Sequence, residues 1–532
     1  MRLLTLILAL GVSHVATNDG SLRMADVNHC TDCMNHCTNL LKWMELNGAQ
    51  VTGVRVAYFP EHGWGLARSR PRAHSTAVPG YFAFPSTFIL SAQTALVEQG
   101  PLPAVLGVDP HGIRDGTVDL EHIKVGCTNQ DDDDFCVTFD GSEAVVAMYL
   151  ALERAKGFDS FWYPYIDSIV PPSTPVYSLL MAALGGPARN VREWRQTGIG
   201  LEWVYGGMLA PGALVNLTES AQLIRKTFGP SSYASHALES AFHDELEKHQ
   251  MQFAVLQRGG ILESVMDQGG PRDSSFQPVD HELEMRRLLA WSNLVASSRG
   301  ISSDIFNSGE RSMGFALIPL WDMINHKRST RHHNFGTYLA AENATRPYGN
   351  MISYYNPAQG PLEEDDGSEI LNDYGFPAEC ALEWLLKFGF IPEDFLETIT
   401  DSHSAEAGTG AAGCSDIVIG GQRHLVHAGT TGEFNVAELI RKAEAAWQES
   451  YTAGKGQLPA LRLANVLLVR ADELPADAFL RAQFDGTAIR LPKDHPYRTS
   501  DLRMARRNAA AVMLLERQAL LGARAAILER LP

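Results

Sequence analysis

The spacing at which apolar residues recur changes along this chain, and this change constrains the fold more than any other feature of the sequence. Runs rich in alternating, β-branched and aromatic residues over 54–59, 65–68 and 81–90 predict short strands joined by turns. Strand-like segments return much later, at 314–319 and 367–374. Strands on both sides of a long interval predict a single β domain that is interrupted by an insertion.

The interval between these strands has the period of a helix. Apolar residues three and four positions apart over 142–156, 237–257 and 281–299 predict amphipathic helices. We therefore expect an α+β fold, in which a helical subdomain over about 140–290 is inserted into a split β-fold that spans 49–395.

The rest of the chain, 396–532, is predicted to form a mostly helical domain. Helical periods cover 435–451, 458–468 and 501–528, and the last of these is rich in Ala, Leu and Arg. A stretch rich in Gly, Ser, Ala and Thr over 402–413 predicts a linker or a long loop ahead of these helices.

The first residues, 1–20, are typical of a targeting leader. One Arg is followed by an apolar run and then by small residues. The run has about ten residues, whereas a membrane-spanning helix needs about 20, and no later stretch reaches that length. We expect a mature protein without an integral membrane segment, delivered to the secretory pathway or to a plastid. Without a working leader the protein would be cytoplasmic.

The next segment, 21–48, combines clustered cysteines with a short helix. Cys30, Cys33 and Cys37 have a spacing that suits zinc, or disulfides if the leader is real. No second half of a zinc site stands elsewhere in the sequence, so no metal site is predicted. Apolar spacing over 40–46 predicts a helix that ends at the following Asn-Gly pair.

Composition restricts the partners. The chain has 532 residues, of which 45% are hydrophobic, and is long enough for a large core. Its 44 Lys and Arg against 62 Asp and Glu give a formal net charge of -18, whereas nucleic acid requires a basic surface. We therefore expect no nucleic-acid partner. A basic protein segment would suit the charge, although solubility alone also explains it. The chain is expected to be a monomer.

Residues with possible chemical roles occur as short motifs in a definite order. Gly63-Trp-Gly65 follows the first strand, Ser298-Arg299 ends a helix, Trp321-Asp-Met-Ile-Asn-His326 follows an apolar strand, and Ile370-Leu-Asn-Asp-Tyr-Gly375 forms a later one. Each motif alone is a weak signal, because paired glycines usually serve turns and a strand Tyr is usually part of the core. Their order along the chain makes them informative.

Together the motifs resemble the SET domain, specifically the branch that contains the RuBisCO large-subunit lysine methyltransferases and the actin-histidine methyltransferase. The resemblance extends over 40–90, 143–175 and 291–392, is especially close at Ser160-Phe-Trp-Tyr-Pro-Tyr-Ile-Asp167, and is poor over 177–280. It implies a split SET fold, S-adenosylmethionine as cofactor, and a protein substrate held by the C-terminal helical domain.

The resemblance also implies roles for individual residues. Tyr374 would be the catalytic-site tyrosine, and a positioning role suits it better than that of a strong base, because a tyrosine has a pKa of about 10. Arg299 would face the methionine carboxylate of the cofactor as a bidentate partner. The residues implied to bind the cofactor are His62, Gly63, Trp64, Gly65, Arg299, Asp322, Asn325 and His326.

Several positions depart from the pattern of this branch and bear on the methyl acceptor. His62 stands where relatives often carry Glu, and Phe388 replaces the Tyr of a Tyr-Gly-Phe motif. Ile301 stands two residues after Arg299, where the histidine-specific relative has Asn. Ile301 and Phe388 are therefore assigned to the substrate channel, and lysine is favoured as the acceptor.

The resulting hypothesis is an S-adenosylmethionine-dependent protein-lysine N-methyltransferase. One alternative is a protein-histidine N-methyltransferase of the same fold. Another is a catalytically silent SET-like protein-binding module, which the changes at His62 and Phe388 suggest.

Overall fold

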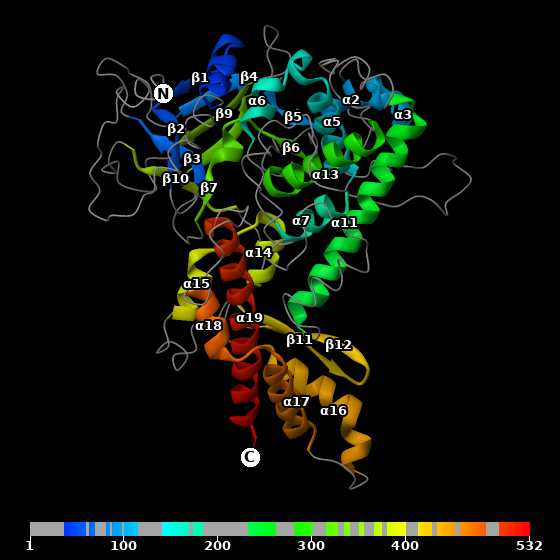
Figure 1. Cartoon of the computed structure of the whole chain (residues 1–532), viewed down its shortest axis with the longest axis vertical. Helices are drawn as coiled ribbons and strands as arrows, with labels where there is room; N and C mark the ends of the chain where they lie inside the picture. The colour runs from blue at the N-terminus through cyan, green and yellow to red at the C-terminus, as the bar shows by residue number, and fades with distance from the viewer. Residues whose placement is uncertain are drawn as a thin grey trace, which may run out of the picture.

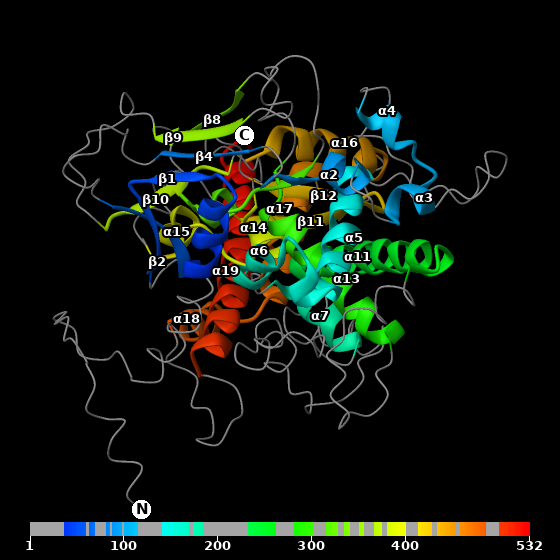
Figure 2. The same cartoon turned by 90° about the horizontal axis from the view of Figure 1, so that it is seen from above.

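The structure is a computed structural model of the chain. It describes residues 37–59, 63–69, 81–85, 88–97, 101–114, 141–169, 174–184, 232–261, 281–301, 315–327, 335–340, 350–355, 367–374, 380–400, 413–427, 434–452, 458–485 and 499–531. The four-stranded sheets lie on one side of the upper part of the molecule and most of its helices on the other (Figures 1 and 2).

The first of two four-stranded sheets is antiparallel and has the order β1-β4-β9-β8. Its strands are β1 Gln50–Thr52, β4 Tyr81–Pro85, β9 Asn350–Tyr355 and β8 Phe335–Ala340. The predicted strand over 81–90 begins as β4 in this sheet. Its end, β5 Leu90–Ser91, pairs instead with β6 Ala316–Leu317.

The second sheet has the order β2-β3-β10-β7 and combines strands from both ends of the split. Its strands are β2 Val54–Phe59, β3 Gly63–Arg68, β10 Glu369–Asn372 and β7 Asn325–His326. β2 and β3 form an antiparallel pair, β10 runs antiparallel to β3, and β7 runs parallel to β10. This pairing confirms the predicted split β-fold.

Helices fill the interval between the two groups of strands, as the sequence predicted. They are α2 Ala92–Val97, α3 Leu102–Leu106, α4 Pro110–Arg114, α5 Gly141–Ala155, α6 Tyr163–Ser168, α7 Pro175–Ala183, α11 Tyr233–Arg258 and α13 His281–Arg299. α5 packs against α13. Both are buried on nearly every side, and the buried residues of α13 include the polar side chains of Ser292 and Asn293.

The C-terminal part is mostly helical, as predicted, and adds a second hydrophobic core. Its elements are α14 Ala381–Phe388, α15 Glu393–Thr400, β11 Cys414–Ile419, β12 Gln422–His427, α16 Val436–Thr452, α17 Pro459–Glu473, α18 Asp477–Phe484 and α19 Thr499–Leu528. α19 joins the cores, because its residues 509–515 belong to the larger one and Leu520, Ala523 and Ile527 to the second. Figure 1 shows this helix running down to the C-terminus.

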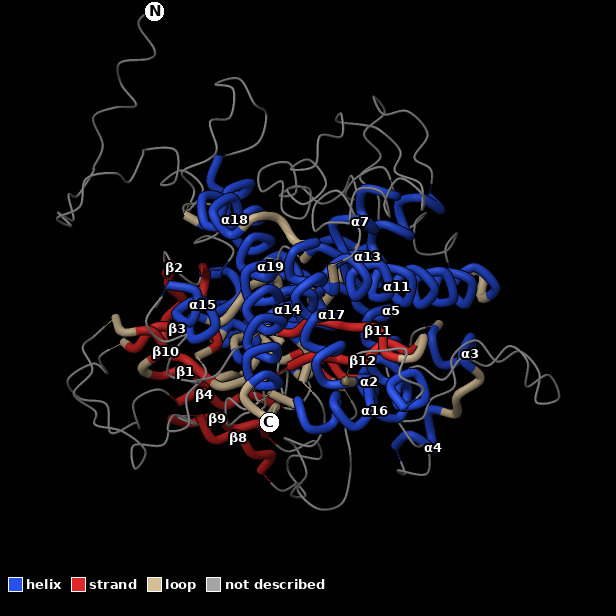
Figure 3. Tube along the Cα trace, turned by 90° about the horizontal axis from the view of Figure 1, so that it is seen from below, coloured by secondary structure: helices blue, strands red, loops and turns tan. Residues whose placement is uncertain are grey.

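The β11–β12 hairpin was not predicted, although the sequence carries a signal for it. Gly420 and Gly421 form the turn with φ of 59° and 84°, a conformation that glycine adopts without steric cost. The hairpin lies lower in Figure 1 than the four-stranded sheets and packs against α19, and the view from below shows it near this helix (Figure 3). A Cβ on Gly413, just before the hairpin, would lie 1.8 Å from the carbonyl oxygen of Leu515, so this contact requires glycine.

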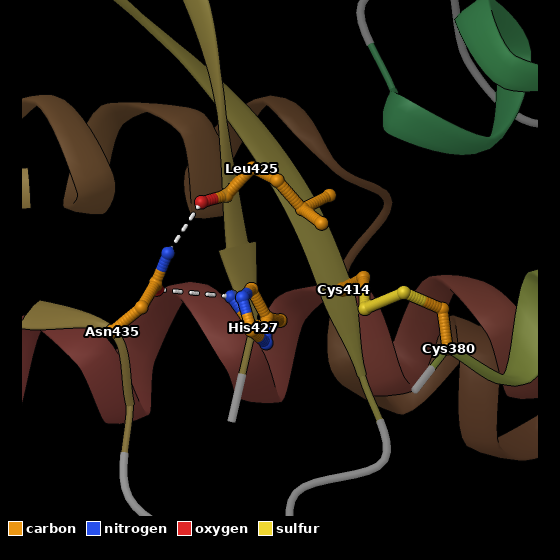
Figure 4. The surroundings of a disulfide bond; sticks show 5 residues. All are labelled: Cys380, Cys414, Leu425, His427 and Asn435. Carbon is orange, nitrogen blue, oxygen red and sulfur yellow. Dashed lines mark hydrogen bonds between the residues drawn. A yellow bond between two sulfur atoms is a disulfide. The ribbon is translucent and has the colours of Figure 1, made fainter. Parts of the chain in front are cut away.

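A disulfide between Cys380 and Cys414 links the start of α14 to the start of β11 (Figure 4). The Cα atoms of the two cysteines are 5.4 Å apart, within the usual range. On the neighbouring strand, where His427 pairs with Cys414, Asn435 accepts a hydrogen bond from the backbone N–H of His427 and donates one to the carbonyl of Leu425. Both strands are thus fixed at the open end of the hairpin.

Candidate functional site

The second sheet brings together motifs that lie far apart in the sequence. β3 carries Gly63, Trp64 and Gly65, β7 consists of Asn325 and His326, and β10 lies between these two strands. The chain leaves β10 at Asn372 and reaches Tyr374 two residues later. The sequence predicted these residues as one site, and the sheet order places them on three consecutive strands of one sheet or directly after one of these strands.

Asn325 is held by contacts across the sheet. Its side-chain Nδ2 donates to Oε1 of Glu369 at 2.7 Å and approaches the carbonyl oxygen of Trp64 at 3.4 Å. A Cβ on Gly65 would lie 2.5 Å from that Nδ2 and 3.1 Å from the Glu369 oxygen. A side chain at position 65 would therefore displace the Asn325 and Glu369 side chains from their present contact.

His326 packs between the end of β10 and α14. Its Nδ1 accepts a hydrogen bond from the backbone N–H of Tyr374 at 3.2 Å, so this nitrogen carries no proton in this arrangement. The ring centroid lies 4.9 Å from that of Tyr374 and 4.4 Å from that of Trp384. These contacts pack His326 against the aromatic rings of the site, and its predicted contact with the cofactor stays a prediction.

Tyr374 places its hydroxyl beneath the Asn325–His326 strand. The hydroxyl donates to the carbonyl oxygen of Ile324 at 3.0 Å. Burial is the largest influence on the group and raises the pKa of Tyr374 to about 12, with Arg299 opposing the shift. The hydroxyl therefore keeps its proton at neutral pH and can position a partner, but it is a poor base.

Aromatic rings from α14 and the turn after it complete this wall. The ring centroid of Phe388 lies 5.2 Å from that of Tyr374 and 5.1 Å from that of Trp384. The ring centroid of Phe390 lies 6.1 Å from that of His326. Gly389 ends α14 with φ of 79°, which lets Phe388 and Phe390 flank the turn. Phe388 was predicted to line the substrate channel, and this assignment stays a prediction. Trp384 and Phe390 were missed, because aromatic residues on an amphipathic helix usually indicate core packing.

The partly exposed Arg299 pairs with the buried Asp322 carboxylate, and the pair supports the turn before β7. Nη1 of Arg299 donates to the backbone carbonyl of Asp322 at 2.9 Å and lies 3.5 Å from its Oδ2. The Tyr165 hydroxyl donates to the same Oδ2 at 2.9 Å. Burial raises the pKa of Asp322, and the Arg299 guanidinium opposes that shift. Asp322 thus supports the turn, while the predicted contacts of Arg299 and Asp322 with the cofactor stay predictions.

The same turn contains a strained residue. Leu320 has φ of 68° and ψ of -43° and is fully buried. A side chain with a Cβ rarely adopts this conformation, which typically costs about 1–3 kcal/mol. The turn it enters is the short 3₁₀ helix Trp321–Met323, which leads directly to Asn325. Packing of Leu320 in the core therefore helps to fix where the Asn325–His326 strand begins.

Two other predicted residues lie apart from this cluster or outside the described ranges. Ile301 forms an isolated antiparallel bridge with Ala316 and is buried, with 6% of its surface exposed. Its assignment to the substrate channel stays a prediction. His62 lies outside the described residues. The ring of Trp64 lies 5.6 Å from that of Tyr58, near the β2–β3 turn.

The described residues contain no group of three or more His, Cys, Asp or Glu side chains that could hold a metal ion. Cys37 is buried at the start of a helix, while Cys30 and Cys33 lie outside the described ranges. Within the same described ranges, none of the helices has the length and apolar character needed to cross a membrane.

Comparison with solved structures shows which fold this is. The chain is similar to the crystal structure of the SET domain of LSMT bound to lysine and AdoHcy, with a TM-score of 0.50 and 12% sequence identity, over 93% of this chain and 91% of that chain. This chain has a SET-domain fold. The split SET fold expected from the motif order is thereby confirmed, although sequence identity is low.

A second similar structure is that of Rubisco LSMT bound to sinefungin and monomethyllysine. Its TM-score is 0.48 at 13% identity, over 93% of this chain and 92% of that chain. No protein-family model matches the sequence. No curated protein matches it either.

Proposed function

We propose that this SET-domain chain is a protein-lysine N-methyltransferase that uses S-adenosylmethionine as its methyl donor. The observation that carries the proposal is the position of Tyr374. Its protonated hydroxyl is bonded to the Ile324 carbonyl, directly before Asn325 and His326, and its ring belongs to an aromatic wall. A hydroxyl fixed in this way can orient a nucleophile beside a bound methyl donor.

The residues around β7 suit the chemistry of S-adenosylmethionine. This cofactor, when bound, supplies a methyl group on a positively charged sulfur. Gly63 and Gly65 of β3 leave the backbone of this strand accessible, because they carry no side chains. The Asn325 amide provides a polar group beside this backbone. Arg299 supplies positive charge nearby, with Asp322 fixing one of its nitrogens. We propose that Gly63, Trp64, Gly65, Asn325 and His326 bind the cofactor, with Arg299 next to its carboxylate.

A methyl acceptor must reach the donor as a neutral nucleophile. Holding a lysine deprotonated at pH 7 costs about 4–5 kcal/mol, because its ordinary pKa is about 10.4. An apolar, aromatic wall lowers this cost by disfavouring a charged amine beside another positive charge. Tyr374 contributes by accepting a hydrogen bond from the amine through its oxygen, since its own proton is directed to Ile324.

Two features favour lysine over histidine as the acceptor. Ile301 provides no polar group at the position two residues after Arg299. The similar structure of the SET domain of LSMT is bound to lysine. We further propose that the substrate is a protein segment held by the C-terminal helical part.

Transfer of labelled methyl groups tests this proposal. The purified chain is incubated with methyl-labelled S-adenosylmethionine and a cell extract, and the labelled residue is identified by mass spectrometry. We expect label on lysine. Tyr374→Phe should reduce transfer by about 10²-fold or more while donor affinity changes little, since positioning groups act mainly in the transition state.

Tyr149→Phe is the matched control, because Tyr149 is a buried tyrosine of α5 whose hydroxyl accepts a bond from the Trp162 indole away from this wall. It should leave transfer unchanged. Calorimetry that detects no binding of S-adenosylmethionine would overturn the proposal, and label on histidine would replace lysine by the alternative acceptor. Unchanged transfer by Tyr374→Phe would remove Tyr374 from the mechanism.

A further inference from the structure

Glu369 is a residue of the site that the motifs did not identify. It begins β10, the strand between the glycine pair and Asn325, and it is partly buried. In the parallel pairing of β10 with β7, Leu371 lies opposite Asn325. Glu369 stands two residues before Leu371 and so shares its face of the sheet. This places the Glu369 carboxylate within reach of the Asn325 amide.

The contacts of Asn325 determine which way its amide faces. Nδ2 lies 2.7 Å from a carboxylate oxygen of Glu369 and 3.4 Å from the carbonyl oxygen of Trp64. Both of these oxygens accept hydrogen bonds, and neither can donate one while the carboxylate is ionised. Only the nitrogen of the amide can face them. The carbonyl oxygen of Asn325 must therefore point to the other side.

Gly65 supports the same arrangement from the neighbouring strand. A side chain at this position would collide with Nδ2 of Asn325 at 2.5 Å and approach Oε1 of Glu369 at 3.1 Å. The backbone at Gly65 has no positive φ that would itself demand glycine. The glycine is thus explained by the space that the Asn325–Glu369 bond occupies.

We infer that Glu369 is a positioning residue, which fixes the Asn325 amide so that its carbonyl oxygen accepts a hydrogen bond from a cationic amino group of the ligand. The inference rests on the proposed function and deepens it, because the ammonium of an amino-acid ligand moiety is such a group. The Glu369 carboxylate adds negative charge behind the amide, which also favours a cationic ligand. A neutral or anionic group at the same position would be disfavoured.

Two ligands that differ in this moiety test the inference. S-adenosylhomocysteine carries the amino-acid group, whereas 5′-methylthioadenosine has the same nucleoside without it. Glu369→Gln lets the Asn325 amide turn, because glutamine both donates and accepts. By calorimetry on the full chain, we expect this variant to bind S-adenosylhomocysteine about tenfold more weakly and 5′-methylthioadenosine with nearly wild-type affinity, since a hydrogen bond to a charged group is lost.

A second variant separates positioning from charge. Glu369→Asp keeps the negative charge, but its side chain is one methylene shorter and should not reach the Asn325 amide. If the hydrogen bond to Asn325 is what matters, this variant should also lose affinity for S-adenosylhomocysteine alone. Because Glu369→Asp retains a carboxylate, it also tests the inference if Glu369→Gln fails to fold. Thermal unfolding of each variant reports whether its fold is intact.

The outcomes are distinguishable. Selective loss for the amino-acid ligand in these variants supports the inference. Equal loss for both ligands, or no loss for either, overturns it while leaving the proposed function in place. Wild-type behaviour of Glu369→Asp would reduce the role of Glu369 to charge alone and so overturn positioning. If the wild-type chain binds neither ligand, the proposed function fails and the inference fails with it.

Discussion

Two buried carboxylates, one beside the candidate site and one where the two hydrophobic cores meet, are stabilised in different ways. Asp322 lies 3.5 Å from a nitrogen of Arg299 and accepts a bond from the Tyr165 hydroxyl. Glu516, in the middle of α19, takes its bonds from a backbone N–H and a serine hydroxyl, which are both neutral donors. One carboxylate is thus paired with a cation at close range, and the other is not.

The difference appears in how the two groups titrate. Burial raises the pKa of both, but the Arg299 guanidinium opposes the shift of Asp322, whereas the pKa of Glu516 rises to about 7. The charged groups near Glu516 are more distant and partly cancel, because Arg470 lowers its pKa and Asp416 raises it. The candidate site therefore contains a carboxylate that is paired with a cation. The region of α19 where the two hydrophobic cores meet, here called the junction, instead contains a carboxyl group that can change its charge near neutral pH.

The largest expected effect comes from breaking the pair at the site. Asp322→Ala removes the carboxylate that faces Arg299 and Tyr165 and should lower the free energy of unfolding by about 3–5 kcal/mol. Urea unfolding followed by circular dichroism measures this. Asp477→Ala is the matched control, because it breaks an exposed pair with Arg481 and should cost about 0.5 kcal/mol or less. If both variants lost the same free energy of unfolding, the Arg299–Asp322 pair would contribute no more to stability than the exposed pair.

Removing the covalent link at the junction should have the next largest effect. Cys380 and Cys414 are 34 residues apart, and closing a loop of that length contributes about 3–4 kcal/mol on a chain-entropy model. The double variant Cys380→Ser, Cys414→Ser should lose about this much in urea unfolding. Reducing agent should destabilise the wild type to the same degree and leave the variant unchanged. A wild type insensitive to reduction would show that the link contributes little.

The junction should also lose stability as pH rises, because Glu516 has a raised pKa. Below a pH of about 4.5 the group is protonated in both the folded and unfolded chain; above it the unfolded chain loses the proton first, while the folded chain retains it up to about pH 7. Unfolding then releases a proton and becomes easier as pH rises. Between pH 4.5 and 7 this group should remove about 3 kcal/mol of stability.

Glu516→Gln isolates this effect, because glutamine resembles the protonated acid and does not titrate. The difference between the wild type and the variant in free energy of unfolding should change by about 3 kcal/mol between pH 4.5 and pH 8, with the variant gaining relative stability at the higher pH. A constant difference across this range would show that Glu516 has an ordinary pKa in the folded chain.

The smallest expected effects compare single hydrogen-bond donors to the two carboxylates. Tyr165→Phe removes a bond of 2.9 Å to a carboxylate paired with a cation and should cost about 2 kcal/mol. Ser415→Ala removes a bond of 3.1 Å to Glu516 and should cost about 1 kcal/mol at pH 5, rising at pH 8 as Glu516 ionises. Unfolding at both pH values measures this. A pH-independent Ser415→Ala effect would contradict the ionisation.

Much of the site could be predicted from the sequence because its residue types are unusual where they occur. Paired glycines after a strand, an Asn-His pair after an apolar strand and a Tyr-Gly end to another strand define Gly63–Gly65, Asn325–His326 and Tyr374. Their order predicted the fold. Glu369 could not be recognised in this way, because a Glu at the start of an alternating strand is ordinarily exposed. Only the strand register placed it against Asn325.

The junction was largely beyond prediction. Cys380 and Cys414 have no spacing that identifies them as partners, and disulfide connectivity cannot be read from sequence alone. Glu516 stands in a long helix whose other charged residues suggest an ordinary solvated position. Its burial follows from the approach of α11, β11 and α19, which meet only in the folded chain.

The sequence by itself determined the split β-fold, the helical insertion, the mostly helical C-terminal part and the motif residues of the site, because hydrophobic periodicity and motif order are local properties. The tertiary structure decided which side chains those motifs meet: Glu369 behind Asn325, Tyr165 and Arg299 around Asp322, and Glu516 where the cores join. These contacts depend on strand register and helix packing between residues far apart in sequence. Burial and charge compensation, which set their chemistry, exist only once those elements have met.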